Sequence, residues 1–284
     1  REQTQRVARA LEALDPTIEL DVRIVRRAGD VDRRTPLAVL GGQGVFAREL
    51  QAALLSGEVD LAVHSAKDLP SALPDDLILA AFVERDDPRD VLVSRDGSGL
   101  PHLPAGARVG TSSRRRVVQL RRLRPDLEVV DLRGNIDTRL RRVAEGAVDA
   151  VLLAAAGLQR MGWEHQISEY LAPEAFVPAP GQGAVAVEWR RDDAELIALL
   201  RGLDHGAARL AVSVERAFLA ATGGGCQSPI GAYARVNGDT IVFQAMLGAE
   251  SLAHAVVATR SWPATEAVGR AGDLARDLGR GLGG

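Results

Sequence analysis

The single cysteine of the chain directly follows three glycines. Cys226 comes after residues 223–225, all Gly, and no second Cys occurs among the 284 residues. Other groups can approach the backbone of a glycine-rich loop closely, and an exposed thiolate there can act as a nucleophile or as an attachment point. A lone cysteine is more often an inert buried residue. One thiol excludes an internal disulfide and a multi-cysteine zinc site.

A lysine and an aspartate stand side by side after a predicted buried strand, in residues 64–70 (His-Ser-Ala-Lys-Asp-Leu-Pro). Lys67 is the only lysine, since 34 of the 35 basic residues are Arg, which indicates a position that needs a compact ammonium. Ligands of open α/β sheets bind beyond the carboxyl ends of strands. A carboxylate beside an ammonium can stabilise a cation or transfer protons. A surface Lys–Asp turn is the alternative.

Two Arg-rich segments occupy residues 110–116 and 132–140. The first combines Thr and Ser hydroxyls, helix N-terminal amides and guanidinium groups, which together bind carboxylates or phosphates. Residues 108–142 carry a net charge of +7, whereas the whole chain carries −3. This contrast indicates a defined anionic ligand more than general nucleic-acid affinity. Five arginines are expected on solvated helix faces instead: Arg114, Arg121, Arg122, Arg141 and Arg142.

Strands that alternate with helices of about ten residues predict an α/β fold with mostly parallel sheets. Turn signals separate the elements, and Asn237-Gly238 predicts a β-hairpin. Helices are expected over residues 7–14, 46–56, 114–124, 136–145, 207–221 and 264–278. Strands are expected over residues 18–25, 59–63, 77–83, 90–93, 108–110, 128–132, 148–154, 233–236 and 240–247.

The length allows two or three domains. Pro and Gly in residues 86–89 and 178–181 predict two crossings between two lobes, and the pattern changes after residue 201 to a smaller α+β unit. We expect domain 1 over residues 1–85 and 184–201, domain 2 over 89–178 and domain 3 over 206–284.

Composition narrows the class of protein. The hydrophobic fraction of 46% and the absence of a run of about 18 apolar residues predict a globular protein with no membrane partner. The sequence opens with a polar helix pattern, so no secretory signal is expected. The five histidines lack metal-ligand spacing, and we expect no metal. A free thiol favours a reducing compartment, hence the cytoplasm.

Taken in order, these motifs make the chain similar to the porphobilinogen deaminase family along essentially its whole length. Residues 64–70 resemble the family's aspartate-bearing motif, and residues 224–231 its cofactor-cysteine signature. Residues 110–116 and 132–140 resemble its two arginine motifs, and residues 180–183 its hinge. The resemblance implies two lobes like those of type II periplasmic binding proteins and a smaller C-terminal α+β domain.

The same resemblance implies a function. The protein would be a cytoplasmic, monomeric transferase of tetrapyrrole and heme biosynthesis that joins four porphobilinogen molecules head to tail, with release of ammonia, into hydroxymethylbilane. A dipyrromethane cofactor would be attached to Cys226 through a thioether bond. Asp68 would be the catalytic residue, because a fixed carboxylate stabilises positive charge on pyrrole nitrogens and helps to protonate the leaving amine.

Each pyrrole carries an acetate and a propionate, so the growing chain is a polyanion. The resemblance implies that Arg115, Arg116, Arg133 and Arg139 bind those carboxylates. It assigns further cofactor contacts to Ser65, Lys67, Thr111, Ser112, Ser113, Arg160 and Gln182.

Two departures from the family pattern bear on these expectations. Relatives begin with a strand whose Arg and Ser contact the pyrroles, and the present sequence starts after that strand. Gln43 stands where many relatives have Lys in a glycine-rich lid.

Two other readings remain open on sequence alone. A non-catalytic protein that binds small anions on the same two-lobed scaffold explains the arginines, but leaves Cys226 and the third domain without a role. A Schiff-base enzyme that uses Lys67, with pyridoxal phosphate, would be trapped by borohydride at that residue.

Overall fold

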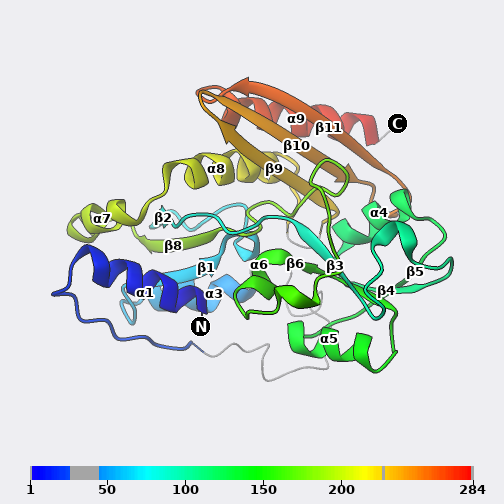
Figure 1. The fold of residues 1–284 in the computed structure, drawn as a ribbon. Helices are drawn as coiled ribbons and strands as arrows, with labels where there is room; N and C mark the ends of the chain where they lie inside the picture. The colour runs from blue at the N-terminus through cyan, green and yellow to red at the C-terminus, as the bar shows by residue number, and fades with distance from the viewer. Residues whose placement is uncertain (1, 26–44, 226–227, 283–284) are drawn as a thin grey trace.

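The computed structural model describes residues 2–25, 45–225 and 228–282. Three sheets, each with its own helices, organise this part of the chain (Figure 1). We call the first two groups of elements the first and second lobes, and the third the C-terminal unit. None of the helices in these ranges has the length and hydropathy needed to span a membrane.

The first lobe is built on a three-stranded sheet of order β1-β8-β2. Its central strand comes from residues more than 100 positions further along the chain than its neighbours, and it pairs antiparallel with both. Trp189 on that strand is fully buried, together with Val185 and Val187. The elements are α1 (Glu2–Leu14), α3 (Val45–Leu55), β1 (Leu61–Ser65), β2 (Leu77–Phe82), β8 (Val185–Arg190) and α7 (Ala194–Leu200).

The second lobe carries a five-stranded sheet of order β5-β4-β6-β3-β7. The chain leaves the carboxyl ends of β4, β5 and β6 and enters a helix after each of them, so the helix N-termini gather at one edge of the sheet. The strands are β3 (Asp90–Ser94), β4 (Arg108–Gly110), β5 (Glu128–Val130), β6 (Ala150–Ala154) and β7 (Glu169–Tyr170), and the helices are α4 (Arg114–Leu123), α5 (Ile136–Ala144) and α6 (Ala155–Gln159).

The C-terminal unit is an antiparallel three-stranded meander with two long helices packed on one face (Figure 1). Phe218 and Phe243 meet edge to face in its core, with ring centroids 5.5 Å apart. The elements are α8 (Gly206–Ala221), β9 (Ile230–Asn237), β10 (Thr240–Gly248), β11 (Ala255–Pro263) and α9 (Ala267–Leu282).

The α/β fold with two lobes and a smaller C-terminal α+β unit is confirmed, as are the six predicted helices and the hairpin at Asn237-Gly238. The expectation of mostly parallel sheets needs correction. Among the described strand pairs of the lobes, only the two that β4 makes are parallel. A crossover helix gives parallel neighbours only when the chain returns to the same sheet, and β3 and β8 enter their sheets after crossings between the lobes.

The strand expected over residues 18–25 is also wrong as stated. This segment has no strand assignment, and Val22 and Ile24 are 53% and 62% exposed. A strand requires a hydrogen-bonded neighbour, and none lies beside this segment among the described residues. Strands β7, β8 and β11 and helices α6 and α7 were not predicted.

Candidate active site

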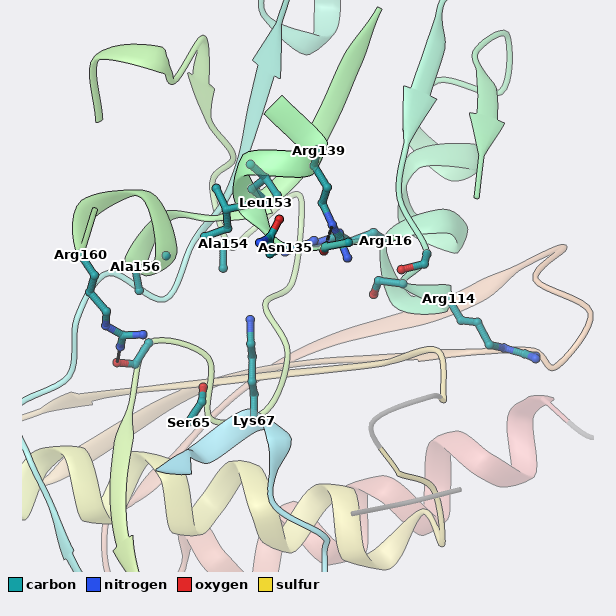
Figure 2. A pocket seen from close by; sticks show the side chains of 16 residues that line it. Ser65, Lys67, Arg114, Arg116, Asn135, Arg139, Leu153, Ala154, Ala156 and Arg160 are labelled. Atoms are coloured by element: carbon teal, nitrogen blue, oxygen red, sulfur yellow. Dashed lines mark hydrogen bonds between the residues drawn. The ribbon is translucent and has the colours of Figure 1, made fainter. Parts of the chain in front are cut away.

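A cavity of about 360 Å³ lies where the two lobes face each other. The first lobe contributes the end of β1 and the turn after it, and the second lobe contributes the helix N-termini that follow β4, β5 and β6. Figure 2 shows Lys67 extending from the first lobe towards Asn135 and Arg116 on the second. The polar and charged lining residues are Ser65, Lys67, Ser112, Ser113, Arg114, Arg116, Asn135, Arg139 and Arg160.

The charge of the lining is uniform. Five side chains of this lining are cationic, and no Asp or Glu is among the described residues that line the cavity. Five Gly and Ala residues leave space between them, and Leu153 and Ile136 supply apolar contact. Such a surface suits a ligand with several carboxylates on an apolar frame.

Arg116 enters the cavity from the first turn of α4 and is oriented by a buried aspartate. Its Nε and Nη2 donate to Asp90 Oδ1 at 3.0 Å and 2.7 Å, and its Nη1 donates to the carbonyl of Leu152 at 2.8 Å. Arg115, the preceding residue, binds the same carboxylate at 2.6 Å and the carbonyl of Val177 at 2.6 Å. Two guanidinium groups therefore share one carboxylate, which leaves a net positive charge beside the cavity.

Asp90 is the first residue of β3 and is completely buried. Burial alone raises the pKa of its carboxyl, but the charges of Arg115 and Arg116 outweigh burial and hold the pKa well below its usual range. Gln182 Nε2 donates to Asp90 Oδ1 at 3.1 Å and to the carbonyl of Pro88 at 2.7 Å. The aspartate thus ties the arginine pair to both crossings between the lobes.

Arg139 lies one turn into α5, whose start depends on two local features. Asn135 is the N-cap and accepts a hydrogen bond from the Thr138 amide at 3.0 Å. Gly134 has φ +122°, a conformation that other residues rarely adopt. Arg139 Nε donates to the Gly134 carbonyl at 2.8 Å, and burial together with Arg116 lowers the pKa of its guanidinium.

Arg160 lines the opposite end of the cavity, at the C-terminus of α6. Its Nε and Nη2 donate to Asp86 Oδ2 at 2.9 Å and 2.6 Å, and Nη2 also reaches the Gly183 carbonyl at 3.3 Å. Asp86 belongs to the first crossing and also binds Arg6 of α1. The position of Arg160 therefore depends on how the two lobes are set relative to each other.

Lys67 and Asp68 share a short 3-10 turn, Ala66–Asp68, at the carboxyl end of β1. Lys67 lines the cavity, and burial lowers its pKa to about 8, although the Asp68 charge opposes that shift. Asp68 is exposed and does not line the cavity. The prediction that both residues lie at the end of a strand is confirmed.

The structure brings seven of the expected site residues into the cavity lining: Ser65, Lys67, Ser112, Ser113, Arg116, Arg139 and Arg160. Thr111, Arg115 and Gln182 are buried behind it, where they support the lining. Arg133 is exposed beside Asp131, with Nε to Oδ2 3.5 Å, and lies outside this lining. Cys226 and Gln43 lie outside the described residues.

One expectation about α4 needs correction. Arg114 was expected on a solvated face, but it lines the cavity and its Nη2 binds Glu250 Oε2 of the C-terminal unit at 2.7 Å. Ser113 occupies the N-cap position without a side-chain capping bond, and its own amide donates to Thr111 Oγ1 at 3.2 Å.

Sequence reasoning missed Asp86, Asp90 and Asn135. The only sequence signal for Asp90 was that adjacent arginines, once buried, require an acid. For Asn135 the signal was its N-cap position before a predicted helix.

Comparison with known proteins gives matches along most of the chain. Residues 1–198 match the family described as porphobilinogen deaminase, dipyromethane cofactor binding domain, and residues 209–279 match the porphobilinogen deaminase C-terminal domain. A porphobilinogen deaminase of Roseiflexus sp. (strain RS-1) is 53% identical over 87% of this chain and 82% of that protein. Those of Roseiflexus castenholzii and Xanthomonas axonopodis pv. citri are 49% and 47% identical over 97% and 94% of this chain, and over 91% and 89% of those proteins.

Among solved structures, the periplasmic VFT2 domain of BvgS from Bordetella pertussis is similar over 70% of this chain and 75% of that one, at 20% identity and a TM-score of 0.41. That score is too low to decide a fold, which rests here on the three sheets and their helices.

Proposed function

The chain belongs to the porphobilinogen deaminase family, and we propose that the cavity between its lobes holds the growing pyrrole chain. As a transferase of this family it joins four porphobilinogen molecules head to tail, releases ammonia and yields hydroxymethylbilane. The observation that supports the location is that the described part of the lining has five cations and no acid, because each pyrrole unit brings two carboxylates.

The residues of the cavity fit the dipyrromethane cofactor of this family. Four carboxylates on two pyrroles require several cationic or hydroxyl donors on a surface that leaves room for flat rings, and the lining supplies both. When bound through Cys226, the cofactor supplies a nucleophilic pyrrole carbon at its free end. Arg116, Arg139 and Lys67 hold carboxylates, while Ser65, Ser112 and Ser113 add hydrogen bonds.

The remaining expected residues act from behind the cavity or beside it. Thr111, Arg115 and Gln182 orient the first turn of α4 and the Asp90 carboxylate, and Arg160 binds carboxylates near the crossings. Arg133 lies on the loop before α5, and binding of a longer pyrrole chain would bring carboxylates to it.

Asp68 is the proposed catalytic residue. Loss of ammonia from porphobilinogen breaks a carbon–nitrogen bond and leaves positive charge on the pyrrole nitrogen, while the amine takes up a proton before it departs. The Asp68 carboxyl group, when it carries a proton, can deliver that proton to the amine, and the carboxylate left behind stabilises the positive charge. The neighbouring ammonium of Lys67 occupies the cavity side of the same turn and holds a substrate carboxylate there.

The organisation of the chain suits this reaction. We propose three domains, over residues 1–85 with 184–201, 89–178 and 206–284, which correspond to the three sheets and allow the lobes to shift as the product lengthens. We propose that the enzyme is a monomer in the cytoplasm, where the thiol of Cys226 stays reduced until it forms the thioether. Light scattering during size-exclusion chromatography tests the oligomeric state.

Intact mass of the purified protein tests the proposed function. The wild type should be heavier than its sequence by two pyrrole units and should convert porphobilinogen into hydroxymethylbilane. Cys226→Ser should have the mass of its sequence and give no colour with an aldehyde reagent for pyrroles. A wild-type protein without adduct and without product would instead favour a protein that only binds anions on the same scaffold, a reading that leaves the match to both family domains unexplained.

A further inference from the structure

Helix α8 of the C-terminal unit reaches across to the turn that carries Asp68. Arg216 Nη2 donates to the carbonyl of Pro70 at 2.8 Å and to that of Ser71 at 3.2 Å. These carbonyls lie two and three residues beyond Asp68. Leu69, which joins Asp68 to Pro70, is buried. One guanidinium group therefore holds the chain immediately after the proposed catalytic carboxylate.

The charge of a buried acid of the first lobe also acts on Arg216. Glu188 of β8 is completely buried, accepts a hydrogen bond from Gln51 Nε2 at 2.8 Å and lies 2.9 Å from His64 Nε2. Burial lowers the pKa of Arg216, and the Glu188 charge acts in the opposite direction. Arg216 Nη1 is also buried, without a hydrogen-bond partner among the described residues. The partly buried Arg216 side chain is thus bonded to the segment after Asp68 and lies within the electrostatic influence of Glu188.

The residue before Arg216 holds the opposite side of the same turn. Glu215 Oε2 accepts a hydrogen bond from the Gly181 amide at 2.7 Å, and Arg85 pairs with the same carboxylate at 2.7 Å. Gly181 has φ +72°, and a Cβ there would lie 3.0 Å from Ala66 C and 3.2 Å from Lys67 N. Two consecutive residues of α8 thus support the turn Ala66–Asp68, one through the Gly181 loop and one through the Pro70 carbonyl.

The same helix leads to the cofactor attachment point. It ends at Ala221, five residues before Cys226.

From this arrangement we propose that Arg216 is a positioning residue, which sets the Asp68 carboxylate relative to the cavity. The inference rests on the proposed function, in which Asp68 stabilises positive charge on the pyrrole nitrogen. A shift of about 1 Å in such a carboxylate can reduce the rate substantially while the carboxylate-binding arginines remain in place. The turnover number should therefore fall, and KM should change little.

Arg209 provides a matched control on the same helix. Its Nη1 and Nη2 bind the carbonyls of Leu79 and Ala80 on β2, and Nε binds Asp204, so it too joins α8 to the first lobe. It does not contact the turn of Asp68. Arg209→Gln and Arg216→Gln both remove a guanidinium from the contact between α8 and the first lobe, but only the second releases the turn.

The experiment compares the two variants as cofactor-loaded enzymes, in the wild-type and in the Asp68→Asn background. Intact mass should show the two-pyrrole adduct in each. Arg216→Gln should lower kcat about tenfold or more with KM within about twofold, whereas Arg209→Gln should stay within about twofold for both. In the Asp68→Asn background Arg216→Gln should lower the rate no further, because the group that it positions is already neutral. Arg216→Lys should restore part of kcat.

Hydrogen–deuterium exchange of the peptide over residues 66–73 gives a readout that does not depend on activity. It should rise in Arg216→Gln and stay unchanged in Arg209→Gln; if Arg216→Gln does not fold, the same comparison is made with Arg216→Lys. Equal effects of both α8 variants on kcat, or an undiminished effect of Arg216→Gln in the Asp68→Asn background, would overturn the inference. Failure of the proposed function is visible separately, as a wild-type protein that makes no hydroxymethylbilane.

Discussion

Arg116 donates two hydrogen bonds to Asp90, from Nε and from Nη2, and both end on the same carboxylate oxygen. This geometry fixes the plane of a guanidinium group whose remaining Nη1 binds a strand carbonyl. Arg116 therefore presents a defined edge to the cavity without rearrangement. A ligand carboxylate that meets such a preorganised group binds with a smaller loss of side-chain entropy.

Asp90→Asn should destabilise the protein and block cofactor loading. The change leaves Arg115 and Arg116 buried without their shared acid, and breaking a buried ion pair in this way typically costs about 3–5 kcal/mol. Urea unfolding measures the loss, and intact mass measures the loading. Asp273→Asn is the control, because Asp273 pairs with Arg276 on an exposed face and its loss should cost about 1 kcal/mol or less. Equal losses from both variants would contradict the role assigned to Asp90.

Asp90 should also make the free energy of unfolding depend on pH in the acid range. Its folded-state pKa lies below the value of 3.8 that an aspartate has in the unfolded chain, so its contribution is complete above that pH and is lost as the pH falls through the folded pKa. Below about pH 4 the free energy of unfolding should fall more steeply for the wild type than for Asp90→Asn. An equal fall in the free energy of unfolding for both proteins would show that other carboxylates cause the loss of stability in acid.

Lys67 should make substrate binding weaken in mild alkali. Its pKa of about 8 lies below the ordinary lysine value of 10.5, so the ammonium loses its proton as the pH rises through 8. KM for porphobilinogen should rise above that pH in the wild type and remain flat over the same interval in Lys67→Arg, which keeps its charge. Between pH 8 and 10.5 the unfolded state binds more protons at this residue, so its contribution to the free energy of unfolding rises. A KM that is flat in both proteins would remove Lys67 from carboxylate binding.

Arg139→Leu should impair binding far more than Arg142→Leu. The first lines the cavity, and a hydrogen bond to a charged group contributes about 1.5–3 kcal/mol, which corresponds to roughly 10- to 150-fold in affinity. The second lies on the exposed face of α5 and pairs with Glu145 at 3.4 Å. Titration of cofactor-loaded enzyme with porphobilinogen separates the two. Similar losses would mean that a general electrostatic field, and not a specific contact, attracts the substrate.

Asp68→Asn should slow turnover at least about 10²-fold, the typical effect of removing one preorganised charge-stabilising group. The amide keeps the shape and hydrogen bonding of the side chain, so the protein should fold and keep its two-pyrrole mass. Single-turnover release of ammonia is the measurement. Release of ammonia at the wild-type rate would show that another residue, and not Asp68, is the catalytic acid.

The local sequence predicted most of the helices and strands and seven of the residues that line the cavity. Helix periodicity and turn residues predicted α1, α3, α4, α5, α8 and α9, because these depend on contacts within a few residues of the chain. The same local logic located Lys67 and Asp68 at the end of a strand, and Arg116 and Arg139 in the first turns of helices, where strand-to-helix joints position them. Family motifs along the chain were enough to predict the activity and the cofactor.

The tertiary structure determined which distant residues and strands pair with each other. Sequence does not show that Asp90 lies under Arg115 and Arg116, since the acid is 25 residues away and reaches them only when β3 packs beside β6. Strand β8 went unrecognised because a strand buried on both faces has no alternation, and its neighbours come from residues more than 100 positions earlier. Arg114 and Arg216 looked like ordinary helix-surface arginines, yet each reaches another part of the fold. Long side chains bind whatever the packing of distant elements brings within reach, and only the folded chain determines those partners.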